Sequence, residues 1–119
     1  MVNWEKLSPA IHSVLTQLKE VVSGFGKVRI TESKYWIRFK VEGGRAFASL
    51  HPSRYNVRVF ISCDENLLND PLGWAKTTPS TKSWAKVHPL VFNIRGSEDI
   101  DYAVKLLKQA YEYVKGRSV

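Results

Sequence analysis

Few residues of this 119-residue chain have the types and spacing that enzyme catalysis requires. Ser49 and His51 alternate on a predicted strand, so both side chains would share one face, as a nucleophile and its base do. No acidic residue lies near them on that face to orient the histidine, so we do not predict a catalytic dyad. Cys63 follows the next strand, where a single cysteine is usually a small packed residue. We therefore expect no catalytic residue, and an enzyme with an acid or base beside His51 is the third alternative.

Metal binding requires clustered histidine, cysteine or acidic side chains. The histidines His12, His51 and His88 are far apart in the sequence, and no two of them have ligand spacing on a helix. His51 and His88 would meet only if the chain between them folded back, with Asp64 or Asp70 nearby. No glycine-rich phosphate loop precedes a predicted helix. We therefore predict neither a metal nor a cofactor.

Basic and aromatic residues give the strongest functional signal, and they concentrate between Lys27 and Ile61. Between Lys27 and Phe60 the chain has eight basic and two acidic residues, an excess that nearly accounts for its net charge of +7. Basic side chains contact phosphates, and aromatic rings stack on bases. The predicted nucleic-acid-binding residues are Arg29, Lys34, Trp36, Arg38, Lys40, Arg45, Phe47, Arg54, Arg58 and Phe60.

Strands must position these side chains, and the alternation of apolar and polar residues predicts five of them. They span residues 28–31, 35–41, 45–51, 55–61 and 90–94. Gly43-Gly44 permits a two-residue hairpin turn in which Glu42 faces Arg45. A four-residue loop after His51 then pairs Phe47 with Phe60. One face of this sheet is aliphatic, and the other collects Trp36, Arg38, Lys40, Phe47, Ser49, His51, Arg58 and Phe60.

Helices are predicted at both ends of the chain. Ser8-Pro9 suits a helix start, and apolar residues recur with helical spacing from Ile11 to Val22, before Gly24 and Gly26 end the helix. Ser97 is the expected cap of the second helix, which runs to Lys115. The order of elements is α-β-β-β-β-loop-β-α. It predicts a single α+β domain over residues 1–119, an antiparallel sheet of about five strands with both helices on one face.

The segment 64–89 has no sustained periodicity and contains several prolines, so it is predicted to be a long loop. Loops of this length in small domains are often functional. Two alternatives remain open for it. It covers the Trp36, Phe47 and Phe60 side chains, or it leaves them open as a binding face. The two combine if the loop clamps a ligand in a pocket of His51, Trp74 and Trp84, and a protein- or small-anion-binding module is therefore the alternative function.

Composition limits the compartment and the partners. The single cysteine excludes an internal disulfide, and the apolar runs are too short to span a membrane. No signal peptide is visible in the first residues, so we expect a cytoplasmic protein without a membrane partner. The isoelectric point near 9.7 favours nucleic acid or an acidic protein as the partner. Both a monomer and a homodimer remain open, because an exposed strand edge would permit pairing.

Four segments of the chain resemble a small uncharacterised prokaryotic domain family. They are Lys34–Lys40, Phe47–Pro52, Asp70-Pro71 and the helix of Ser97–Glu112. Members of this family are often labelled "predicted transport protein" and occur alone or at the C-terminal end of nuclease-like proteins. The resemblance covers nearly the whole chain and assigns no catalytic residues. The basic and aromatic sheet face predicts a non-enzymatic nucleic-acid-binding or nuclease-accessory module. In the family's Gly-His-Trp-Gly segment, only Trp84 of this chain matches.

Overall fold

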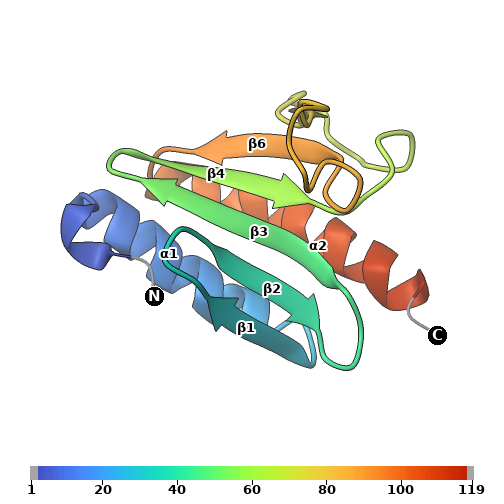
Figure 1. The fold of residues 1–119 in the computed structure, drawn as a ribbon, viewed down its shortest axis with the longest axis horizontal. Coiled ribbons are helices and arrows are strands. Elements are labelled where there is room, and N and C mark those ends of the chain that lie inside the picture. Colours follow the sequence, from blue (N-terminus) through green and yellow to red (C-terminus); the bar gives the residue numbers. More distant parts are fainter. Residues whose placement is uncertain (1–2, 118–119) are drawn as a thin grey trace.

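Six antiparallel strands and two helices form residues 3–117, the part of the chain that the computed structural model describes. The strands lie in the order β1-β2-β3-β4-β6-β5. They are β1 (Val28–Glu32), β2 (Ile37–Val41), β3 (Ala46–Ser53), β4 (Asn56–Ile61), β5 (Lys76–Thr77) and β6 (Leu90–Ile94). The helices α1 (Pro9–Ser23) and α2 (Ile100–Arg117) both lie behind the sheet in Figure 1. The predicted α+β fold is confirmed, with β5 as an additional short strand inside the predicted loop.

Both helices begin beside a short 3-10 turn. Before α1, η1 (Trp4–Lys6) precedes Ser8, whose hydroxyl oxygen accepts a hydrogen bond from the amide of Ile11 (3.3 Å). This confirms the predicted cap. Before α2, Ser97 is the first residue of η2 (Ser97–Asp99) and does not cap the helix. The side chain of Asp99, directly before α2, accepts a hydrogen bond from the amide of Arg95 (3.0 Å).

The turn between β2 and β3 is longer than predicted. The amide of Gly44 donates to the carbonyl of Val41 (2.8 Å), and the amide of Val41 donates to the carbonyl of Arg45 (3.0 Å). Glu42 and Gly43 are therefore the central residues of the turn. Gly43 has a φ of +76°, a conformation that side chains disfavour. The prediction that Glu42 faces Arg45 is wrong by one residue.

A β-bulge in β3 compensates for this offset. Lys40 pairs with Ala46 and Phe39 pairs with Ala48, so Phe47 is the extra residue of β3. The predicted pairs of Phe39 with Ala48, Arg38 with Ser49 and Ile37 with Leu50 are observed. The bulge turns the Phe47 side chain toward the helices. The prediction that Phe47 lies on the basic face beside Lys40 is therefore wrong.

The turn between β3 and β4 contains two residues, because Ser53 pairs with Asn56. The sequence predicted a four-residue loop, so the pairs along these strands are displaced by two residues. Ser49 pairs with Phe60, where the prediction paired Phe47 with Phe60. A displacement by an even number keeps each side chain of β4 on its predicted face.

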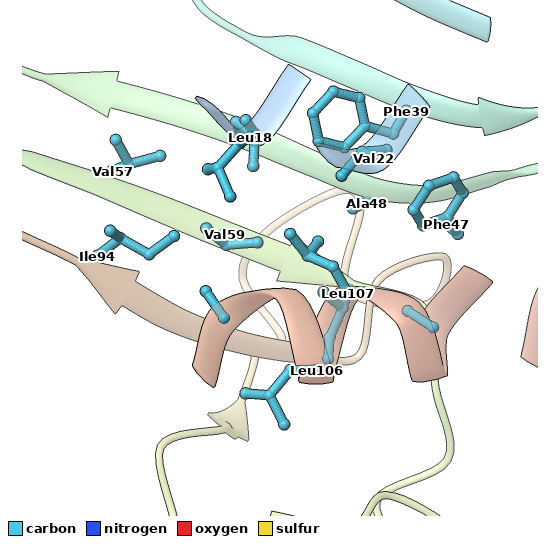
Figure 2. Close-up of a cluster of buried hydrophobic side chains, with 14 of the residues drawn as sticks. Leu18, Val22, Phe39, Phe47, Ala48, Val57, Val59, Ile94, Leu106 and Leu107 are labelled. Carbon is cyan, nitrogen blue, oxygen red and sulfur yellow. The ribbon is translucent and has the colours of Figure 1, made fainter. Parts of the chain in front are cut away.

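The hydrophobic core fills the space between the sheet and the helices (Figure 2). Phe39 and Phe47 lie side by side there, with ring centroids 6.0 Å apart, and the Phe47 ring is 5.3 Å from that of Tyr111 in α2. Val59 and Leu107 are fully buried in the same cluster. The core therefore occupies one face of the sheet and leaves the other for a different role.

Replacing Gly26 with alanine will destabilise the fold more than replacing Gly43 with alanine. Both glycines have positive φ angles, +153° and +76°, so each substitution carries a conformational cost of about 1–3 kcal/mol. At Gly43 the added methyl group meets no atom within 4 Å, whereas at Gly26 it comes 2.3 Å from the hydroxyl oxygen of Tyr111. Urea unfolding measures the difference. In the Gly26→Ala background, a Tyr111→Phe change should recover part of the lost stability, because it removes the hydroxyl oxygen that the methyl group meets. Equal destabilisation by the two glycine variants would contradict this account.

Candidate nucleic-acid interface

The outer face of the sheet, defined as the face turned away from α1 and α2, carries five basic residues. Strand register places Arg29, Arg38, Lys40, Arg58 and Lys76 on this face. Arg29, Arg58 and Lys76 are exposed, and the other two are half-buried. In Figure 1 the outer face is turned toward the reader, in front of both helices. All of these residues except Lys76 belong to the predicted binding set.

Two of these cations lie directly opposite each other, because Arg29 of β1 pairs with Lys40 of β2. Like charges in this position repel each other and weaken strand pairing. Register places no acidic residue on the outer face among the strand residues that the structure describes. Within residues 3–117 the structure contains one ion pair, Lys19–Glu32 at 3.2 Å, and it lies on the helix side. The positive charge of the outer face is therefore not neutralised by strand carboxylates.

Trp36 lies at the entrance to β2 and supports Arg38. The guanidinium carbon of Arg38 is 4.1 Å from the centre of the Trp36 ring, within the range of a cation–π contact. The Nε atom of Arg38 is buried and has no hydrogen-bond partner among the described residues. A buried donor without a partner costs about 1–3 kcal/mol. An added acceptor oxygen at this position would recover part of that cost.

The loop between β4 and β6 covers one part of the outer face. The Trp84 ring lies 5.4 Å from that of Phe60 and 5.2 Å from that of His51. Phe60 is only 1% exposed as a result. The covered alternative is thus observed at Phe60, which is not accessible for stacking on a base. The Nε1 atom of Trp84 is a second buried donor without a partner in the described chain.

His51 lies beneath Trp84 and beside the cations of the outer face. Its Nε2 atom is 3.1 Å from the hydroxyl oxygen of Ser49, so the two residues do meet. Burial, followed by the charges of Arg58, Arg38 and Lys82, lowers the pKa of His51 to about 4. The imidazole is therefore neutral at pH 7. Within residues 3–117 no carboxylate forms a hydrogen bond with its ring, so the arrangement lacks the orienting acid of a catalytic triad.

His88 anchors the end of the same loop in a buried site. Its Nδ1 atom lies 2.6 Å from the hydroxyl oxygen of Ser62, which also contacts the carbonyl of Val87 (2.5 Å). The Ser62 hydroxyl has one proton to donate to that carbonyl, so the neutral imidazole donates from Nδ1–H. The hydroxyl of Thr78 donates to the carbonyl of His88 (2.8 Å). Burial, followed by the charges of Arg38 and His51, lowers the pKa of His88 to about 4.

Trp74 does not join the predicted pocket with His51 and Trp84. Its ring packs against Tyr102 of α2 at 4.5 Å and against Phe92 at 6.4 Å, on the helix side of the sheet. Asp70 holds this part of the loop by accepting hydrogen bonds from the amides of Trp74 (3.1 Å) and Ala75 (2.8 Å) and from the hydroxyl of Tyr102. Desolvation raises the pKa of Asp70, but these hydrogen bonds outweigh it and hold the pKa below its usual value.

The remaining predicted cations occupy turns. Lys34 lies between β1 and β2, Arg45 precedes β3, and Arg54 lies between β3 and β4. Arg45 lines a cavity of about 790 Å³ beside Cys63, and Lys34 and Arg54 line a second cavity of about 900 Å³. Neither cavity is lined by the predicted pocket residues. The three turn residues therefore surround the outer face without belonging to it.

The sequence patterns did not predict three residues whose side chains could contact a ligand. Lys76 reaches the outer face through β5, a strand of two residues that no periodicity can reveal. Tyr35 and Tyr55 were assigned to strands, but they lie in turns and are 70% and 68% exposed. A repeated pattern of serine, a basic residue and tyrosine at 33–35 and 53–55 could have revealed the two tyrosines.

No three His, Cys, Asp or Glu side chains of residues 3–117 come together as metal ligands. Neither α1 nor the described length of α2 combines the size and hydropathy that crossing a bilayer demands. Comparison with known protein families, with curated proteins and with solved structures finds no match.

Proposed function

We propose that this protein is a non-enzymatic nucleic-acid-binding domain whose outer face contacts the phosphate backbone. The observation that carries the proposal is the direct pairing of Arg29 with Lys40 on neighbouring strands. Such a pair weakens the fold, so its presence favours a role outside folding. An anionic polymer across the outer face would turn this repulsion into two favourable contacts.

The same geometry favours phosphate contacts over base stacking on the sheet. Phe47 lies in the core and Phe60 lies under Trp84, so neither ring is offered to a base. Trp36 remains half-buried with Arg38 over its ring. The buried Nε donor of Arg38 provides a further reason for an acceptor near this position. The outer face therefore fits a backbone-reading surface better than a base-reading sheet.

Binding to oligonucleotides should weaken steeply with salt. Each phosphate contact releases counterions, and contacts from all five outer-face cations predict a slope of log K against log salt of about −4.5 for duplex DNA and about −3.5 for a single strand. Fluorescence anisotropy of labelled oligonucleotides at several salt concentrations measures this slope. Absence of binding at low salt would end the proposal, and binding to an acidic protein in place of the oligonucleotides would favour the alternative partner.

A further inference from the structure

One end of the sheet carries a groove, here named the turn groove, between η1 and two hairpin turns. Its volume is about 900 Å³, and its lining includes Lys6, Lys34, Tyr35, Arg54 and Tyr55. This volume lies in the range of about 300–1,000 Å³ that is typical of ligand pockets. Figure 1 shows η1, the β1–β2 turn and the β3–β4 turn at the same end of the molecule, opposite the loop between β4 and β6.

The two turns that flank the turn groove share the residue pattern serine, cation, tyrosine. In each turn the cation lies over the ring of the following tyrosine. Lys34 Nζ is 5.5 Å from the Tyr35 ring centre, and the guanidinium carbon of Arg54 is 5.6 Å from the Tyr55 ring centre. Both tyrosines are about two-thirds exposed, although large aromatic side chains are usually buried. The sheet thus presents two matched pairs of ring and cation on one groove.

Backbone hydrogen bonds hold the walls of the turn groove in place. The amide of Ser8 donates to the carbonyl of Arg54 (2.9 Å), which ties the start of α1 to the β3–β4 turn. The amide of Ser33 donates to the carbonyl of Trp36 (2.9 Å) and closes the β1–β2 turn. The Ser53 hydroxyl donates to the carbonyl of Asn56 (3.1 Å). The groove is therefore formed before a ligand arrives, which lowers the entropic cost of binding.

We propose that the turn groove binds unpaired bases of a single-stranded nucleic acid, which stack on Tyr35 and Tyr55. Exposed aromatic rings stack on bases of any sequence, and neighbouring cations hold the phosphates between the bases. Bases within a duplex are already stacked on each other, so the groove selects single strands. This inference rests on the proposed function of the outer face and deepens it by naming the class of nucleic acid.

The charge of the turn groove is complementary to such a strand. Its lining contains three cations and one carboxylate, that of Glu5. Trp36 directly follows Tyr35 in the chain and supports Arg38 on the outer face. A strand whose bases enter the groove therefore meets the cations of the outer face as its backbone continues along the sheet.

The test compares a labelled oligothymidylate with a duplex of the same length at low salt. The double variant Tyr35→Ala/Tyr55→Ala should lose single-strand affinity by about tenfold for each tyrosine, while its duplex affinity changes little. The double variant Tyr35→Phe/Tyr55→Phe should keep the single-strand affinity, because phenylalanine retains the ring. Leu67→Ala and Leu72→Ala remove side chains of similar exposure, 64% and 63%, and serve as matched controls that leave both affinities unchanged.

The outcomes separate this inference from the proposed function. Unchanged single-strand affinity in the alanine double variant, with oligonucleotide binding otherwise intact, overturns the turn groove and leaves the outer face standing. Equal losses in the alanine and phenylalanine variants also overturn stacking, since only the hydroxyl groups would then matter. If the wild-type protein binds neither the oligothymidylate nor the duplex, both proposals are overturned.

Discussion

Replacing Arg29 and Lys40 together with glutamine will weaken oligonucleotide binding by about tenfold or more, because a charged hydrogen bond contributes about 1.5–3 kcal/mol. The slope of affinity against salt should fall by about 2, since each lost phosphate contact removes about 1. Folding should not suffer. The two cations face each other across β1 and β2, so their removal relieves a repulsion of about 0.2–1 kcal/mol.

The matched control for this variant lies on the other side of the molecule. Lys105 and Lys108 are exposed on α2, and glutamine at both positions removes the same net charge. If the outer face is the interface, this control reduces affinity only slightly through the overall charge. Urea unfolding and anisotropy titrations on both double variants measure stability and affinity separately. Equal losses of affinity in the two variants would show that net charge, and not the outer face, governs binding.

The free energy of unfolding will fall as the pH drops from about 6.5 to about 4. His51 and His88 both have pKa values of about 4 in the folded state, below the ordinary value of 6.5. Between these pH values the two histidines are protonated in the unfolded chain but remain neutral in the folded protein. Lowering the pH therefore favours unfolding. The stabilisation is complete above pH 6.5 and is lost as the pH falls toward 4. For the buried His88 the shift corresponds to about 3 kcal/mol.

Two variants separate the contributions of the histidines to this pH dependence. Asn at position 88 places an amide group near Nδ1, and Gln at position 51 places one near Nε2, so His88→Asn and His51→Gln keep the contacts with Ser62 and Ser49. Each variant should remove up to one proton from the slope of stability against pH. Urea unfolding between pH 4.5 and 7.5 measures this slope. A wild-type stability that is flat across the window would contradict the assignment.

The α+β fold and the predicted pairs beyond the bulge were accessible from sequence because alternation and helical spacing extend over many residues. Tyr35–Val41 alternates clearly, and its pairing with the next strand is observed from Phe39 onward toward Ile37. The position of Phe47 was not accessible. A β-bulge depends on the balance between turn geometry and core packing, and neither leaves a local pattern in the sequence.

The sequence predicted the basic side chains of the candidate interface, but it did not predict which aromatic side chains are exposed. The strand cations Arg38 and Arg58 follow directly from alternation. Burial of Phe60 depends on Trp84, which is separated from it by a long segment without periodicity, so only the tertiary structure brings the two rings together. The exposed tyrosines were missed for a different reason. Tyr35 fits a strand pattern by residue type, although the turn begins before it.

The extra residue at Phe47 also has a genetic consequence. Phe47 is the extra residue of β3, so loss of its codon would remove the bulge and leave the pairs of Lys40 with Ala46 and of Phe39 with Ala48 unchanged. Such a deletion would take one aromatic ring out of the space between Phe39 and Tyr111 while every cation of the outer face kept its place. Sequences that lack one residue here should therefore carry a compensating larger side chain elsewhere in the core, and alignments of this segment should allow a gap before Ala48.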